Sequence, residues 1–283
     1  MDNQTYHALP QVSASQLVTL RRSPLHFWDR YINPNKPVIE PTPAMFLGTL
    51  AHAAILEPQE FDSRYIVLPD GIDRRTKEGK ALYESIVATG KEPVKSDMWL
   101  LVQGMLGASL RNNTLQAILC DALTEHTILY SCNETLEACR ARPDIYLPAC
   151  TEYPHGLILD LKTTTDASPD AFGRRAWDGG MLIQAAHYCA GVYAETGEWP
   201  AYGWVAIESQ RPHALKIYMA TPQQMQYGID ERFRLLRIYR ECIDSGKWPA
   251  YGDDIAELEL PVWANREAGI EIDQESVEVK YND

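Results

Sequence analysis

The chain has 283 residues, of which 45% are hydrophobic and 23% charged, a composition typical of a globular protein large enough to bury a substantial core. No apolar run reaches the length of a membrane span, and the first residues lack the basic start and apolar stretch of a signal peptide. We therefore expect a cytoplasmic protein without a membrane partner. The six cysteines form no CxxC pair and lie in segments that resemble core, so we expect reduced, buried thiols.

The formal net charge of −13 is unevenly distributed. Residues 249–283 hold ten acids and two bases, a net of −8, so the first 248 residues carry only −5. The body of the protein can therefore still present a local positive channel. Two interpretations of the acidic C-terminal extension remain open: a solubilising, partly disordered segment, or a charge mimic that occupies a nucleic-acid channel or a partner surface.

The first half of the chain has helical patterns. Ser13 with Gln16 has the form of a capping box, and the Ser23-Pro24 pair predicts a second short helix directly afterwards. Further helices are expected in three segments: 44–57 before Pro58, a helix after the basic loop 71–77 that ends near Gly90, and one or two helices over 96–122.

From about residue 125 the composition becomes rich in β-formers. Turn residues at 148–156 separate two of the expected strands. The order predicts an α/β or α+β sandwich in which helices flank a mixed sheet. The expected elements are strands over 126–147 and 156–165, a helix over 179–196 before Gly197, strands over 201–209 and 214–220, and a final helix from Thr221-Pro222 to about Ser245.

The strand "GLILDLKTTT" carries charges on one face. Side chains alternate along a strand, so its leucines point one way while Ile158, Asp160 and Lys162 point the other. If residues 147 and 157 close a hairpin, Asp144 lies directly opposite Asp160. Opposed like charges are destabilising at a Cβ separation of about 4.5–5.5 Å, so a cation is expected between them.

A hard divalent cation such as Mg²⁺ suits two carboxylates, and Lys162, one strand repeat beyond Asp160, could then act on a phosphate or a water. A salt-bridged hairpin without function is the simpler account of an isolated DxK tripeptide. The "ARPD" stretch that ends at Asp144 and the apolar strand around Asp160 favour the metal site.

Two helices offer further polar candidates. Gly48 and His52 are four residues apart and share a helix face, where the glycine would let another backbone approach beside the imidazole. Gln184 and Tyr188 share a face in the same way. Taken alone, each pair is more simply explained as structural.

Four motifs in this order resemble the PD-(D/E)XK nuclease superfamily, in its RecB-like branch and closest to the RecE-type exonucleases of phages and prophages. They are GxxxH at 48–52, RPD at 142–144, DLKTT at 160–164 and QxxxY at 184–188. The resemblance extends from about residue 13 to about 250. It implies a restriction-endonuclease-like α/β core, formed by one nuclease domain over 1–250 (helical part 13–122, catalytic part 125–246), with an acidic extension over 251–283.

The resemblance also implies roles for individual residues. His52, Asp144, Asp160 and the Leu161 carbonyl would ligate Mg²⁺, with Mn²⁺ as a substitute. Lys162 would be the catalytic lysine, together with Asp144, Asp160, Gln184 and Tyr188 in the catalytic set. Some relatives hold an iron–sulfur cluster through one early and three late cysteines. Here the early position reads Ser23-Pro24 and no cysteine follows Cys242, so we expect no cluster.

A nuclease needs cations along the DNA phosphates. Loop residues Arg74, Arg75 and Lys77 are the first candidates, followed by Arg21 with Arg22 and then by Arg174 with Arg175; for each group a solvated surface is an equal alternative. The four arginines between 232 and 240 spread around the final helix, and there a solvated face is expected.

The function implied by the resemblance is a Mg²⁺-dependent exonuclease that degrades linear double-stranded DNA from 5′ to 3′ and leaves 3′ tails. Its implied partners are a RecT-like single-strand annealing protein and further copies of the chain in a closed ring, with a tetramer preferred over a trimer. The alternatives are a RecB-like endonuclease or flap nuclease on the same fold, and a non-catalytic DNA-binding module.

Overall fold

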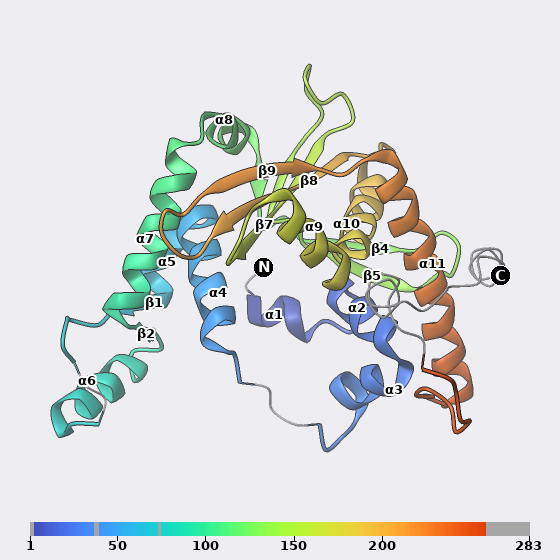
Figure 1. Ribbon diagram of the computed structural model, residues 1–283, viewed down its shortest axis with the longest axis horizontal. Helices are drawn as coiled ribbons and strands as arrows, with labels where there is room; N and C mark the ends of the chain where they lie inside the picture. Colours follow the sequence, from blue (N-terminus) through green and yellow to red (C-terminus); the bar gives the residue numbers. More distant parts are fainter. Residues whose placement is uncertain (1–2, 37–39, 73–74, 259–283) are drawn as a thin grey trace, which may run out of the picture. The chain divides into compact units, whose positions relative to one another are not determined.

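The computed structural model describes residues 3–36, 40–72 and 75–258. The chain divides into two compact units, 1–250 and 251–283. All helices and strands of the described residues belong to the first unit (Figure 1), and residues 251–258 contain neither. Within the described residues, no helix is both long and apolar enough to cross a lipid bilayer.

Short helices occupy the N-terminal segment. The capping box at Ser13 and Gln16 is confirmed, because each side chain bonds the other residue's backbone N–H. Ser23 caps the next helix, as the Ser-Pro pair predicts. The elements are α1 (Asn3–Ala8), α2 (Ala14–Arg22), α3 (Pro24–Phe27) and the π-helical turn η1 (Trp28–Ile32).

The next group of elements includes the helices that cover one face of the central sheet. Helix α4 spans Pro43–Leu56, and a Cβ added at Gly48 would lie 3.3 Å from Thr163 Oγ1, so this glycine admits a side chain of the sheet rather than a backbone. Strands β1 and β2 form a small parallel pair. The remaining elements are α5 (Pro58–Arg64), β1 (Tyr65–Val67), α6 (Lys77–Val87), β2 (Glu92–Val94), α7 (Ser96–Arg111) and α8 (Asn113–Asp121).

The central sheet has five strands in the order β3-β6-β7-β8-β9 and is mixed, with β7 and β8 parallel and the other pairs antiparallel. Leu147 pairs with Leu157 across the β6–β7 hairpin, as the sequence predicts. The strands are β3 (Leu123–Thr124), β6 (Ile145–Leu147), β7 (Leu157–Thr164), β8 (Ala201–Glu208) and β9 (Leu215–Met219).

The second face is covered by helices and by a separate antiparallel hairpin of β4 (Ile128–Ser131) and β5 (Ala138–Ala141). The sequence analysis did not predict α9 (Pro169–Asp178), although Ser168-Pro169 is a typical helix start. Helices α10 (Met181–Thr196) and α11 (Pro222–Ser245) confirm the two predicted long helices, with Gly197 and Gly246 as left-handed caps.

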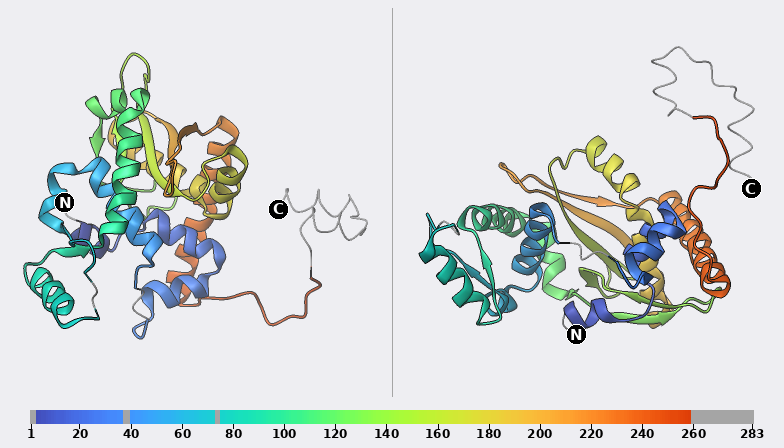
Figure 2. Two further views of the ribbon diagram at one scale, coloured as in Figure 1. Left: turned by 60° about the vertical axis from the view of Figure 1, so that its left-hand side comes forward. Right: turned by 90° about the horizontal axis from the view of Figure 1, so that it is seen from below.

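Two hydrophobic cores lie on the two faces of the sheet, and Figure 2 shows helices on both sides of it. The leucines at 157, 159 and 161 pack with α4, α7 and α8, whereas Ile158 packs with α2, α10 and α11. This alternation confirms the predicted strand faces and the α/β architecture with a helix-flanked mixed sheet.

One row of residues crosses the whole sheet. Backbone pairing places Asp160 beside Trp204 and Trp204 beside Tyr218. On the other side, continuing the observed registers by one residue places Asp144 opposite Asp160 and Glu125 opposite Asp144. The row therefore reads as one acid just after β3, one just before β6 and one on β7, followed by two aromatic residues on β8 and β9.

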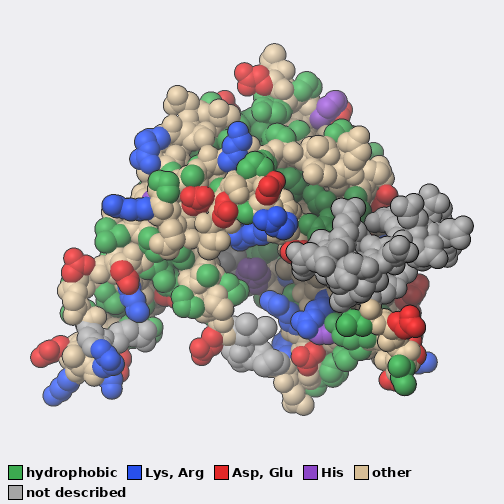
Figure 3. Space-filling view, in the orientation of Figure 1, with side chains coloured by type: hydrophobic (Ala, Val, Ile, Leu, Met, Phe, Trp, Pro, Cys, Tyr) green, Lys and Arg blue, Asp and Glu red, His purple; other side chains and the backbone are tan. Residues whose placement is uncertain are grey.

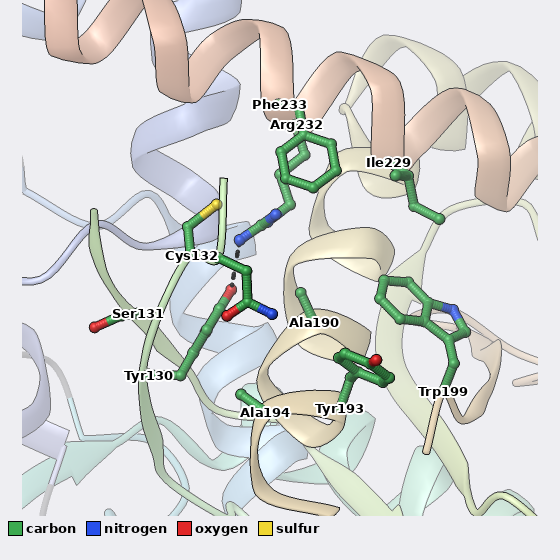
Figure 4. A pocket seen from close by; sticks show the side chains of 11 residues that line it. Tyr130, Ser131, Cys132, Ala190, Tyr193, Ala194, Trp199, Ile229, Arg232 and Phe233 are labelled. Atoms are coloured by element: carbon green, nitrogen blue, oxygen red, sulfur yellow. Dashed lines mark hydrogen bonds between the residues drawn. The ribbon is translucent and has the colours of Figure 1, made fainter. Parts of the chain in front are cut away.

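Two expectations about buried residues were wrong. Cys120 and Cys150 are exposed, although the other four cysteines are buried and all six are free. Arg232 does not lie on a solvated face: it is only 3% exposed, and its guanidinium donates to the Tyr130 hydroxyl (3.4 Å) and to His187 Nδ1 (3.4 Å). The pocket in Figure 4, with a volume of 130 Å³, has Arg232 on one side and Trp199 on the other. Arg232 thus ties α11 to the β4–β5 hairpin.

Candidate active site

The site lies just before the first residue of β6, where the facing edge of β7 has no strand partner. Strand β6 starts only at Ile145, so the backbone of Leu161 on β7 has no β6 residue to pair with. Its N–H donates instead to Asp144 Oδ2 (2.7 Å), and its carbonyl lies 2.8 Å from His52 Nε2. The Nδ1 atom of the same imidazole lies 3.5 Å from Asp144 Oδ2. The structure therefore brings together three of the four expected metal ligands around one peptide unit.

Asp160 lies beside this group and is fully buried. Its Oδ2 is in direct contact with the Lys162 ammonium, and its Oδ1 accepts a hydrogen bond from Gln184 Nε2 (2.9 Å). The Gln184 side chain in turn lies within hydrogen-bonding reach of the Tyr188 hydroxyl. The four residues that the sequence singled out on β7 and α10 thus form one connected polar chain.

Burial and neighbouring charges shift the pKa values of Asp160 and Lys162. Burial raises the pKa of Asp160 to about 6, and the Asp144 carboxylate adds to the rise while Lys162 opposes it. Burial lowers the pKa of Lys162, but the carboxylates of Asp160 and Asp144 outweigh burial and hold the pKa above its ordinary value. Lys162 is therefore a protonated donor at neutral pH.

Glu125 is an additional acid that the sequence analysis did not identify. It follows the two-residue strand β3 with a left-handed φ of 51°, and its N–H donates to the Asp144 carbonyl (3.0 Å). Burial, and next the Asp144 carboxylate, raise the pKa of Glu125 to about 8 against the opposing charge of Arg142. Only the pairing of β3 with β6 could have revealed this residue, and β3 is too short to show in the sequence.

The donor set fits a hard divalent cation. Among the described residues, possible ligand atoms of His52, Glu125 and Asp144 lie within 4.8 Å of one another, and Asp160 is not part of that group. Carboxylate oxygens and imidazole nitrogen are ligands that Mg²⁺ or Mn²⁺ accepts. Burial, together with the negative charge of Asp144, raises the pKa of Glu125 and of Asp160, and a bound cation would favour the charged form of both carboxylates.

A groove of 860 Å³ leads to the polar chain, and Lys162, Gln184 and Tyr188 form part of its wall. The opposite wall carries Ser15 of α2 and Arg30 of the π-helical turn. Figure 3 shows the hollow beneath α9, between α4 and α2, with Lys and Arg side chains at its rim. The groove offers both donors and cations to a polyanion.

The predicted basic segments differ in their distance from this groove. Arg175 of α9 is exposed and lines the groove with Lys162, whereas Arg174 is not among the residues that line it. Arg21 lies over the Trp177 ring at 5.3 Å, and the adjacent Arg22 is exposed. Arg74 lies outside the described residues; Arg75 and Lys77 lie at the start of α6, which Figures 1 and 2 place far from α10.

A family model described as a "PDDEXK-like domain of unknown function (DUF3799)" matches residues 13–260. No curated protein matches the sequence significantly.

Among solved structures, a "Putative exonuclease" from Eubacterium rectale has a TM-score of 0.64 and 13% identity, over 93% of this chain and 97% of that chain. A phage-related exonuclease from Haemophilus somnus 129PT has a TM-score of 0.33 and 13% identity, over 86% of this chain and 99% of that chain. At these identities the first likeness shows a shared fold, and the second is too weak to add to it.

Proposed function

The chain belongs to the PDDEXK-like family DUF3799, and from this premise we propose that it is a metal-dependent nuclease that hydrolyses phosphodiester bonds in DNA. One observation carries the proposal: buried Asp160, placed by the hairpin register opposite Asp144, is paired with Lys162 beside a groove that also holds Arg175. A buried acid pair is costly unless a cation joins it, and a lysine beside it suits a phosphate substrate.

We assign the cation to His52, Asp144, Asp160 and the Leu161 carbonyl, with Glu125 as a further oxygen donor. A divalent cation at such a site supplies Lewis acidity and lowers the pKa of a water molecule. Within the chain, Asp144 and His52 hold the Leu161 peptide in place through its N–H and carbonyl. Gln184 fixes the Asp160 carboxylate through Oδ1.

Lys162 is the principal catalytic residue in this proposal. Its protonated ammonium would donate to a non-bridging oxygen of the scissile phosphate and offset the charge that develops in the transition state. The Tyr188 hydroxyl would help to position the phosphate or the attacking water. Arg175 and Arg30 would bind neighbouring phosphates along the groove.

The finer proposal is a RecE-type exonuclease. It would use Mg²⁺, digest linear duplex from 5′ to 3′, and pass the 3′ tails to a RecT-like annealing protein, as a ring-forming oligomer with four subunits preferred. The four ordered motifs support this specificity. We further propose that residues 1–250 form the nuclease domain and 251–283 an acidic extension; most charged residues of that extension lie outside the described residues.

The test uses linear duplex DNA labelled at either the 5′ or the 3′ end, with Mg²⁺ or EDTA. Early release of the 5′ label in Mg²⁺ and none in EDTA is expected, while closed circular plasmid stays intact. Lys162→Ala should lower kcat by about 10²–10³-fold, comparable to removing one transition-state donor. Cleavage of the circle would favour the endonuclease alternative, and unchanged activity in Lys162→Ala would contradict the assigned mechanism.

A further inference from the structure

A second hollow, of 520 Å³, lies on the other side of α9 from the groove of the candidate active site. Its floor is formed by Trp204 and Tyr218 of the sheet, and its walls by Phe172 and Trp177 of α9 and by Gln224 and Tyr227 of α11. Among the described residues that line it there is no acidic or basic side chain. We call this hollow the aromatic groove.

The aromatic groove adjoins the candidate active site through one helix and through the sheet. Arg175 lines the active-site groove, whereas its neighbours Ala176 and Trp177 line the aromatic groove. Trp204 pairs with Asp160, and Tyr218 pairs with Trp204. Tyr218 therefore lies two strand spacings, about 10 Å, from Asp160. About three stacked nucleotides, at 3.4 Å each, span this distance.

The rings of the aromatic groove form two contacting pairs, and Trp177 is the most exposed of them. Trp177 is 51% exposed, and its ring lies 5.0 Å from that of Tyr227 at a tilt of 34°. Phe172 stacks on Tyr218 at 5.3 Å and 12°. Arg21 lies over the Trp177 ring at 5.3 Å and donates to the Trp177 carbonyl oxygen (3.0 Å). Rings on the floor and walls with a cation at the rim match the way proteins hold single-stranded nucleic acid.

An apolar peptide is a less suitable occupant. It would bury against the rings, but it would bring no phosphates to the adjoining groove, whose wall carries Lys162 and Arg175. Nucleotides satisfy both features, because their bases stack on rings and their phosphates pair with cations.

We propose that the aromatic groove binds unpaired nucleotides of the DNA by base stacking, next to the phosphate that the active site holds. This inference rests on the proposed nuclease function for the identity of the polymer. It adds the substrate class: DNA that is single-stranded beside the cleavage point, whether at a frayed end or in the strand left after digestion.

The test is binding of fluorescein-labelled oligo(dT) to the full chain in EDTA, so that no hydrolysis occurs. Trp177→Ala should weaken binding at least about fivefold, because stacking is worth roughly 1–3 kcal/mol per base. Trp177→Phe keeps a ring and should recover most of the affinity. Tyr193→Ala removes an exposed ring of α10 that does not line the aromatic groove, and should bind oligo(dT) like the unmodified protein.

Equal oligo(dT) affinity in Trp177→Ala and the unmodified protein would overturn the inference. A second pattern would also overturn it: Trp177→Ala no longer binds the apolar dye anilinonaphthalene sulfonate but keeps its affinity for oligo(dT). That pattern indicates a groove for an apolar protein segment. A Mg²⁺ assay on labelled duplex separates the two proposals. Trp177-dependent oligo(dT) binding without hydrolysis supports the nucleotide site while the nuclease proposal fails; hydrolysis with Trp177-independent binding does the reverse.

Discussion

The buried histidine His187 should make the stability of the fold depend on pH. Its ring is 0% exposed, with Nε2 3.0 Å from the Arg140 carbonyl and Nδ1 accepting from Arg232 Nε at 3.4 Å. Burial, and next the charge of Arg232, lower the pKa of His187 to about 3. The imidazole is therefore neutral in the folded protein over the whole physiological range.

The sign and size of the effect follow from this shift. The unfolded chain protonates His187 near its ordinary pKa of about 6.5, so the unfolded state binds the proton first and stability is lost as pH falls from about 6.5 towards 3. The free energy of unfolding falls by up to about 1.4 kcal/mol per pH unit, which gives a loss of about 2 kcal/mol between pH 8 and pH 5.

The assay is urea unfolding at pH 8, 7, 6 and 5 for the unmodified protein and His187→Gln. The variant is expected to be less stable at pH 8, because a buried hydrogen-bond network is disturbed, and the difference should shrink by about 2 kcal/mol at pH 5. Other titrating groups cancel in this comparison. His155→Gln, at an exposed position, controls for the loss of any histidine. A difference between the unmodified protein and His187→Gln that stays constant from pH 8 to pH 5 would refute the reasoning.

Three further predictions concern the groove, the cation and the packing. Arg175→Ala should weaken duplex binding and reduce the slope of log K against log salt by about 1, whereas Arg174→Ala, outside the groove, should change the slope less; equal slopes would contradict the groove assignment. Glu125→Gln should weaken Mn²⁺ binding by about tenfold in calorimetry, and an unchanged Kd would remove Glu125 from the site. Gly228→Ala should lower the unfolding free energy by about 1–3 kcal/mol, because its Cβ would lie 2.3 Å from the Leu182 carbonyl oxygen. Gly173→Ala has open space and should stabilise α9 by about 0.5–1 kcal/mol; a thermal scan that ranks the two variants the other way would contradict this.

The parts of the site that could be predicted depend on local patterns. The hairpin register followed from the alternation around Asp160 and from turn residues at 148–156, and the observed pairing of Leu147 with Leu157 confirms it. The long helices followed from caps such as Thr221 and Gly246. These signals lie within a few residues of the feature that they determine.

The parts that could not be predicted depend on contacts between distant segments. Glu125 joins the acids only because a two-residue strand pairs with β6. Arg232 is buried because its helix lies against Tyr130, about a hundred residues earlier, although the spacing of the arginines alone indicates a solvated face. The aromatic groove is built from residues of α9, α10, α11, β8 and β9, and α9 was not predicted.

In the β6–β7 hairpin the two strands must keep their length, whereas the connecting loop 148–156 can vary in length. Asp144 and Asp160 each lie three residues, about 10 Å along the strand, from the closing pair Leu147–Leu157, and most of the loop 148–156 is exposed. A residue inserted into either strand would turn Asp144 or Asp160 to the opposite face, whereas residues added at the loop tip would leave the register intact. The loop is therefore a suitable position for an affinity tag or a fluorophore, and length variation among homologues should concentrate there.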